Sequence, residues 1–97
     1  MNKRDLVEKM ATDARLTKIQ AARALDAFLD GVQASLIRGN RVTLVGFGSF
    51  MVAKRKSKRI RDPRHGTPMQ IEARLVARFA PGLELKEAIE NSERPDL

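Results

Sequence analysis

The amino-acid sequence predicts an α+β fold in which a long basic arm extends from a small body. Apolar residues at helical spacing fill the first part of the chain, up to about residue 38. Strand-like patterns follow at residues 42–53 and again at residues 70–79. Between them lies KRKSKRIRDPR, residues 54–64, in which seven of eleven residues are Lys or Arg. Helices followed by strands indicate an α+β domain, and a charged run between two strands indicates a ribbon.

Two helices are expected at the start of the chain. Asn2 can cap the first helix, with Asp5 in its first turn, and the apolar stripe of this helix ends near residue 14. Thr17 and Gln20 have the spacing of a capping box at the start of the second helix. A continuous apolar stripe follows, and Gly39 is expected to stop the helix.

Strands are expected after the helices. RVTLV is β-branched, and Gly46 and Gly48 on either side of Phe47 suit a tight hairpin or bulge, after which MVAK continues the extended chain. Residues 70–79 alternate with a period of two, which is typical of a half-buried strand. The apolar face of this strand is Ile71, Ala73, Leu75, Ala77 and Phe79.

The end of the chain is expected to form a short helix and a polar tail. Pro81 and Gly82 end the sheet and open the helix, with Pro81 near the first turn, where proline is tolerated. Residues 91–97 form the tail. The length of the chain suits one domain, residues 1–97.

The basic run and its extended flanks predict an arm over about residues 53–75, with Pro63 and Gly66 at its turn. Roughly ten residues per strand at ~3.3 Å per residue would reach about 30 Å. Only about 75 residues then remain to form a core, and chains that small often depend on oligomerisation. A dimer is therefore favoured over a marginally stable monomer. Its large core and interface residues are expected to be Phe28, Phe47, Phe50 and Phe79.

Positive charge is concentrated in the arm. The net charge is +7, of which residues 1–53 contribute eight bases and five acids, or +3. Residues 54–64 contribute seven bases and one acid, or +6, and residues 65–97 contribute four bases and six acids, or −2. A footprint of this kind favours an anionic partner.

Several functional classes find no support in the sequence. No apolar stretch approaches the roughly 18 residues that a membrane span needs, and the start of the chain lacks the apolar core of a signal peptide. There is no cysteine and a single histidine, His65, so neither a disulfide nor a metal site is predicted. No nucleophile has an identifiable base. We therefore expect no enzyme, no cofactor and no membrane association, and the absence of cysteine fits the cytoplasm.

The order of these elements resembles a known family. Two helices, VTLVGFGSF at Val42–Phe50, a basic arm with Arg61–Pro63, FAPG and a short helix resemble the bacterial HU/IHF family of histone-like DNA-bending proteins over about residues 1–91. The resemblance implies an intertwined dimer with a helical base, a three-stranded antiparallel sheet and a protruding two-stranded β-ribbon arm. It also implies binding and bending of double-stranded DNA with little sequence specificity, in the cytoplasm and associated with the nucleoid. A homodimer is expected, with a heterodimer with a paralogue as the alternative.

The resemblance also implies which residues meet the DNA. In the family the arms follow the minor groove and a proline at each tip wedges between base pairs, and Pro63 holds that position. Basic side chains along a ribbon can neutralise several phosphates. The predicted DNA-binding residues are Lys54, Arg55, Lys56, Lys58, Arg59, Arg61, Pro63 and Arg64 on the arm and Lys3 and Lys86 on the body.

Three residues of the tip depart from the family pattern, which reads glycine, arginine, asparagine, proline, any residue, threonine, glycine. Ile60 replaces the first glycine and is expected to pack across the ribbon, with a second wedge as the alternative. Asp62 replaces the asparagine and brings a negative charge among phosphates. His65 replaces the threonine and can add a positive charge at low pH.

Other functions stay open at this point. Binding to structured RNA is one alternative, although the chain lacks the surface aromatic platform that single-strand binders use. Site-specific, IHF-like DNA bending is another, since FAPG and the polar extension look slightly more like that branch. A third is a protein-interaction module whose arm binds an acidic partner.

Overall fold

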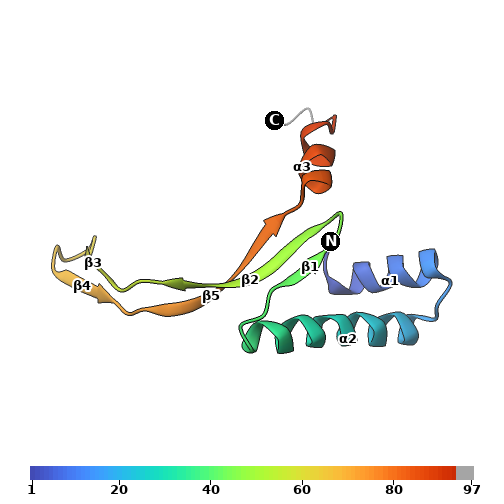
Figure 1. Ribbon diagram of the computed structural model, residues 1–97, viewed down its shortest axis with the longest axis horizontal. Coiled ribbons are helices and arrows are strands. Elements are labelled where there is room, and N and C mark those ends of the chain that lie inside the picture. Colours follow the sequence, from blue (N-terminus) through green and yellow to red (C-terminus); the bar gives the residue numbers. More distant parts are fainter. Residues whose placement is uncertain (94–97) are drawn as a thin grey trace.

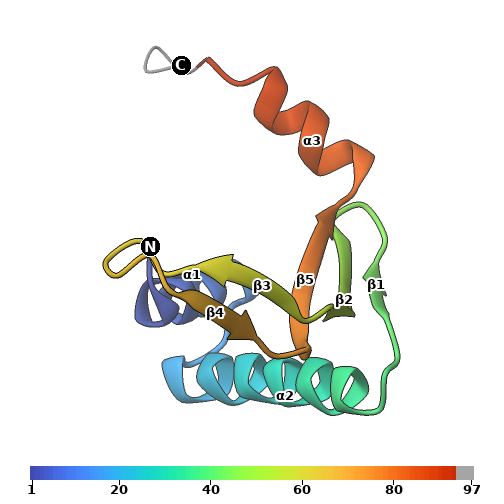
Figure 2. The same ribbon diagram turned by 90° about the vertical axis from the view of Figure 1, so that its left-hand side faces the viewer.

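The computed structural model describes residues 1–93 and has the predicted α+β architecture (Figure 1). Two helices pack side by side at one end, the strands run away from them into a ribbon, and a third helix projects from the last strand (Figures 1 and 2). The elements in chain order are α1 (Lys3–Ala14), α2 (Lys18–Ile37), β1 (Val42–Leu44), β2 (Gly48–Arg55), β3 (Lys58–Arg61), β4 (Pro68–Ile71), β5 (Arg74–Pro81) and α3 (Leu83–Glu90). Part of the predicted polar tail, residues 94–97, lies outside the described residues.

The first two helices begin at the residues that the sequence predicts. The Asp5 backbone N–H donates to Asn2 Oδ1 at 2.9 Å, and the Asn2 N–H donates back to Asp5 Oδ2 at 3.2 Å. At the start of α2, Thr17 and Gln20 exchange the corresponding pair of hydrogen bonds, each 3.0 Å long. Both are capping boxes, which satisfy backbone N–H groups that a helix start leaves without partners.

The end of α2 is also the predicted one. The helix stops at Ile37, and Gly39 adopts a φ of 80°, a left-handed conformation that glycine takes without a Cβ penalty. The Gly39 N–H donates to the Leu36 carbonyl and the Asn40 N–H donates to the Ser35 carbonyl, both at 2.9 Å. This pair of bonds is a Schellman motif, and it turns the chain toward β1.

The predicted glycine hairpin joins β1 and β2. Gly46 has a φ of 86°, and the Phe47 N–H donates to the Leu44 carbonyl at 2.9 Å, which closes a tight turn. Gly48 is required for a different reason. A Cβ at this position would lie 2.6 Å from the Ala80 carbonyl oxygen and 2.6 Å from a ring carbon of Phe79. The three strands then form an antiparallel sheet in the order β1-β2-β5, with β2 in the centre.

The ribbon continues beyond this sheet as a second, two-stranded ladder of β3 and β4. The prediction of one unbroken strand over residues 70–79 is therefore wrong, because the chain leaves the strand conformation at Glu72 and Ala73 between β4 and β5. Across the ribbon, β2 and β3 are interrupted at Lys56 and Ser57. The register is the same on both sides of this gap, since Arg55 lies opposite Arg74 and Lys58 lies opposite Ile71.

Like charge borders the gap on its inner side. Arg55 and Arg74 lie directly opposite each other at the last pair of the inner ladder, and like charges in that position destabilise strand pairing. Lys56 and Lys58 follow immediately. The alternation in the sequence carries no information about this cross-strand pair, which is why one continuous strand was expected.

Pro81 also differs from expectation. It is the last residue of β5, opposite Gly48, and not part of the first turn of α3. Gly82 caps the helix, which begins at Leu83. In the chain β5 pairs only with β2, so Pro81 ends an edge strand, a place where proline removes no ladder hydrogen bond.

The shape of the chain is far from compact. Its radius of gyration is 19.0 Å, against about 13 Å for a compact chain of 100 residues. Within residues 1–93, the buried apolar side chains are only Ala11, Ala21 and Leu25, all in the helix pair.

The predicted large core residues are not buried in the single chain. Three of the four phenylalanines, Phe28, Phe47 and Phe79, are 40–46% exposed. Phe79 stacks at a tilt on Phe50 and Phe47, with ring centroids 4.9 and 5.4 Å apart, yet the cluster stays open on one side. Leu75, on the predicted half-buried face, is 72% exposed. The sheet thus has an apolar face that this chain alone does not cover.

Candidate nucleic-acid interface

The arm carries its arginines on one face of the ribbon. Residues directly opposite each other in an antiparallel ladder share a face, and successive residues alternate between faces. Arg55 lies opposite Arg74, Arg59 opposite Gln70, and Arg61 opposite Pro68. Arg59 and Arg61 are two residues apart in the outer ladder, so the pleat places them on one side of it, and the unchanged register gives the Arg55–Arg74 pair the same parity. We call them the arginine face.

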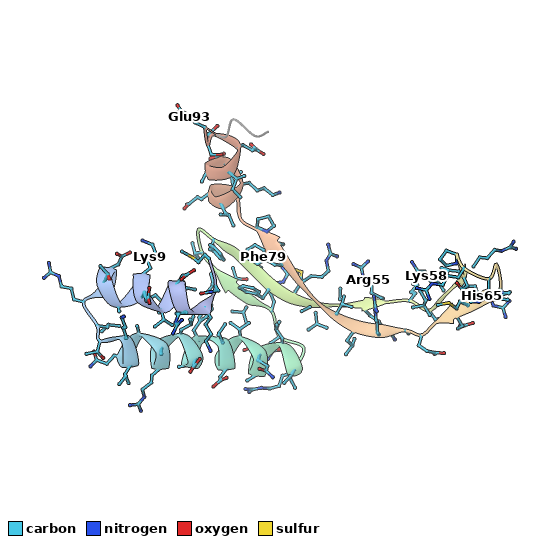
Figure 3. All side chains as sticks on the ribbon, turned by 180° about the vertical axis from the view of Figure 1, so that it is seen from behind. Lys9, Arg55, Lys58, His65, Phe79 and Glu93 are labelled. Carbon is cyan, nitrogen blue, oxygen red and sulfur yellow. The ribbon has the colours of Figure 1, made fainter. Side chains whose placement is uncertain are left out.

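Lysines alternate with these arginines and occupy the other face. Lys54 lies opposite Leu75 and Lys58 lies opposite Ile71. At the gap between the ladders the ribbon bends and twists, and side chains of both faces line one hollow of about 510 Å³. Its basic residues are Arg55, Lys56, Lys58 and Arg74. Figure 3 shows Arg55 and Lys58 as sticks spaced along the arm.

The charges of the arm are free for a partner. All the predicted basic arm residues are exposed. Within residues 1–93, no Lys or Arg of the arm lies within 4.0 Å of a carboxylate, whereas body lysines such as Lys3 and Lys9 are paired. The structure therefore brings together eight predicted site residues on one slender arm, and no carboxylate of residues 1–93 pairs with the basic ones.

Asp62 organises the arm tip. Its backbone N–H donates to the Thr67 carbonyl at 2.8 Å, and its carbonyl accepts the Gly66 N–H at 2.7 Å. Its carboxylate accepts the Arg64 N–H at 2.8 Å, and His65 Nδ1 lies 3.2 Å from the other carboxylate oxygen. Hydrogen bonding from the Arg64 backbone, and then from His65, holds the pKa of Asp62 below its usual value.

These contacts give the departure from asparagine a structural role. The carboxylate forms the turn that a short polar side chain makes with a backbone N–H two residues later. Pro63 lies inside this turn and is exposed. Ile60 lies opposite Met69 one pair below the end of the ladder, so it forms a cross-strand apolar pair as expected.

The two predicted body residues lie apart from the arm. Lys3 sits at the start of α1, where its Nζ is 2.7 Å from Asp26 Oδ1. Lys86 is exposed on α3, which projects from the end of β5 opposite to the arm (Figure 1). A single chain therefore does not join either residue to the basic surface of the arm.

Three further arginines share the arginine face and were absent from the predicted site. Arg74 lies opposite Arg55, Arg78 lies opposite Met51, and Arg41 Nη2 lies 3.9 Å from Met51 Sδ. The alternation of residues 70–79 already placed Arg74 and Arg78 on the polar side of their strand. What the sequence lacked was the pairing of β5 with β2, which aligns them with the arm.

In the part of the chain that the structure describes, no group of three or more His, Asp or Glu could hold a metal ion. Among these same residues, no helix has the length and apolar character to span a membrane.

Comparison with known proteins supports the predicted resemblance. The model of a family described as bacterial DNA-binding protein matches residues 1–90. The DNA-binding protein HU of Haemophilus influenzae is 46% identical over 89 residues, which cover 92% of this chain and 99% of the relative. HU of Xylella fastidiosa is 41% identical and covers 95% of this chain and 98% of its own length.

Solved structures agree with the sequence relatives. The cocrystal structure of Anabaena HU with DNA matches with a TM-score of 0.88 and 38% identity, over 95% of this chain and 100% of that one. HU from Thermotoga maritima matches with a TM-score of 0.67 and 30% identity, over 92% of this chain and 98% of that one. The match of family, sequence and fold confirms the resemblance: this chain belongs to the HU family of bacterial DNA-binding proteins, whose members are architectural and not enzymatic.

Proposed function

We propose that this protein binds double-stranded DNA as a homodimer and bends it. The two arms follow the minor groove, and Pro63 at each tip wedges between base pairs. The observation that carries this proposal is an exposed proline, held in a hydrogen-bonded turn, at the end of an arm whose Lys and Arg side chains have no acidic partner among residues 1–93. A protein that bends DNA in this way would organise the nucleoid in the cytoplasm.

The uncovered apolar face supports the dimer. A hollow of about 670 Å³ opens between α2 and the sheet, lined by apolar residues such as Phe28, Phe50 and Leu75. α3 stands clear of the sheet and exposes Leu83 and Ile89 (Figure 2). Three buried apolar residues are too few for a stable monomer of this size, so a second copy that covers the hollow and α3 supplies the missing core.

Phosphate contacts supply the affinity. We assign them to Lys54, Arg55, Lys56, Lys58, Arg59, Arg61 and Arg64, with Lys3 and Lys86 on the body reaching flanking DNA. Neutralising about 6–10 phosphates releases counterions and costs ~10³–10⁵ in affinity between 50 and 200 mM salt. Because phosphates carry no sequence information, preference arises from how easily a site deforms.

Wedging supplies the bend. A rigid apolar ring inserted between base pairs unstacks a step and kinks the duplex toward the major groove. The unstacking energy is offset by the contacts that the arms make once the DNA is bent. Nicked duplexes, which bend easily, are therefore expected to bind more tightly than plain ones.

Fluorescence energy transfer across end-labelled duplexes, plain and nicked, tests the proposal. The protein should raise transfer, and Pro63→Ala should reduce the bend while leaving the salt dependence of binding unchanged. A bend that is the same with Pro63→Ala would refute the wedge. Sedimentation of the free protein tests the dimer, and a matched RNA duplex as competitor should bind less tightly than the DNA.

A further inference from the structure

The arm tip holds the only histidine of the chain next to a carboxylate. His65 Nδ1 lies 3.2 Å from Asp62 Oδ2, while Asp62 Oδ1 accepts the Arg64 N–H. Both carboxylate oxygens are thus engaged within the tip. The same aspartate closes the turn through its own backbone, so the His65 contact touches the group that positions Pro63.

His65 is open to a partner. Its side chain is 72% exposed, whereas that of Asp62 is only 25% exposed. Figure 3 places His65 at the far end of the arm. The charged groups around it are Arg61 at the end of β3 and Asp62 and Arg64 in the turn. The first residues of β4 carry no charge, and α1, α2 and α3 lie at the other end of the molecule (Figure 1).

We propose that His65 makes DNA binding by the arm tip proton-linked. In its protonated form the imidazolium neutralises Asp62 and presents a donor to a DNA phosphate beside the site of the wedge. In its neutral form the Asp62 carboxylate leaves one negative charge in the tip that faces the polyanion. This inference rests on the proposed DNA-binding function and adds a residue and a pH dependence to it.

The sign of the pH dependence of DNA affinity follows from charge. A DNA phosphate favours the charged form of a nearby imidazole, so the bound tip holds more protons than the free tip. Affinity therefore rises as the pH falls from 8 to 5.5, the range in which histidine ordinarily changes charge. An exposed ion pair is weak, so the expected gain is about two- to fivefold per tip, or about four- to 25-fold for two tips.

The salt dependence gives a second readout. Each additional cation on a phosphate steepens the slope of log K against log salt by about 0.9. For two protonated tips the slope at pH 5.5 should exceed that at pH 8 by up to about 1.8. A change in protein stability alone would not alter this slope.

The experiment measures binding of the full chain to a nicked duplex by fluorescence anisotropy, at pH 5.5, 6.5, 7.2 and 8 and at four salt concentrations. His65→Gln keeps a polar side chain of similar reach and should abolish the pH-dependent part of affinity and slope. Arg23→Gln on α2 serves as the control for a changed charge on the body and should keep the pH profile.

The outcomes separate this inference from the proposed function. If the unchanged protein fails to bind the duplex at pH 8, the proposed function is wrong. If it binds and bends at pH 8 but its affinity and slope are the same at pH 5.5, the proton linkage is overturned. A pH dependence that persists in His65→Gln overturns it as well, because the dependence then comes from another group, such as the amino terminus.

Discussion

Gly48 lies at the end of the β2–β5 ladder, where the neighbouring strand leaves little space for a side chain. A methyl group there would meet the Ala80 carbonyl oxygen and the Phe79 ring at 2.6 Å, a distance at which the backbone must move. We expect Gly48→Ala to lower the free energy of unfolding by about 1–3 kcal/mol, the range for overpacked sites. Urea unfolding at fixed protein concentration measures this change.

Gly31 is the matched control for that substitution. It lies within α2, and a Cβ there would have no atom within 4 Å. Gly31→Ala should raise the free energy of unfolding by about 0.5–1 kcal/mol, because alanine has less conformational freedom to lose in a helix. Equal changes in the free energy of unfolding for the two substitutions would contradict the close packing described at Gly48.

The pKa of Asp62 makes a separate prediction at low pH. Hydrogen bonds from the Arg64 N–H and from His65 lower this pKa from its ordinary value of 3.8. The stabilisation of the tip by the carboxylate is therefore complete above the ordinary value and is lost as the pH falls through the lowered one. Within the range below about pH 5, the Arg64 amide signal in NMR should stay fixed down to about pH 4 and then shift. In Asp62→Asn, which keeps the acceptor oxygen, the signal should stay fixed over this same range.

Single residues were predictable where their partners are close in sequence. The capping boxes of Asn2 and Thr17 and the turn at Gly39 depend on hydrogen bonds between residues three to five positions apart, so pattern alone located them. Asp62 was recognised as a departure, but its role depends on how the tip folds back on itself. The side chain that brings a negative charge among phosphates also supplies the acceptor oxygen that shapes the turn.

At the scale of the element, the arm is two ladders joined by a short gap, and the last pair of the inner ladder sets Arg55 opposite Arg74. The gap keeps the register but removes the regular pairing of four residues. A polyanion placed against the hollow at this gap would relieve the repulsion between Arg55 and Arg74. We therefore expect the arm to become more regular on binding, which amide hydrogen exchange at Lys56 and Ser57 would detect as added protection.

Arg74 tests whether the face defined by pairing takes part in binding. We predict that Arg74→Gln removes one phosphate contact per subunit and reduces the salt slope by about 0.9 for each copy of the chain. Affinity should fall about equally for all sequences. Arg23→Gln on the exposed side of α2 should leave both quantities unchanged, and a similar loss in that control would point to net charge alone.

The existence of the arm could be predicted from sequence, but its internal construction could not. A basic run between two strand patterns was enough to indicate a ribbon. The opposition of Arg55 and Arg74, the gap that follows it and the alignment of Arg78 with the arm all depend on strand register. Register is a relation between distant residues, and no local pattern in a single chain specifies it.

At the scale of the whole molecule, the body and the arm should be separable. Arg55 and Arg74 form the last pair of the inner ladder, so a two-residue Asn-Gly turn can replace residues 56–73. We predict that this shortened protein keeps its helical circular dichroism and its sedimentation behaviour. It should lose DNA bending and at least tenfold in affinity, because the wedge and most of the phosphate contacts are removed.

Unfolding of the shortened protein would contradict this division of roles between body and arm.

The size of the core explains why this division could be predicted from the sequence. Without the arm, about 75 residues of the chain remain to form a core, and this argument favoured a dimer over a marginally stable monomer before any fold was known. Phe79 was expected among the core and interface residues of the dimer, but the exposure of Leu75 was not foreseeable, because Leu75 looks like an ordinary core residue in the sequence.

The unchanged register across the gap has a consequence for how arms of this kind can vary in length. No residue is inserted on either strand, so each cross-strand pair adds one residue to both strands. Side chains of successive pairs therefore point to opposite faces of the ribbon. Deleting one opposite pair would therefore turn the tip over, whereas deleting two would shorten the reach by about 7 Å and restore its orientation. The length of the arm therefore follows a parity rule, and only even changes keep the orientation of the tip relative to the arginines of the inner ladder.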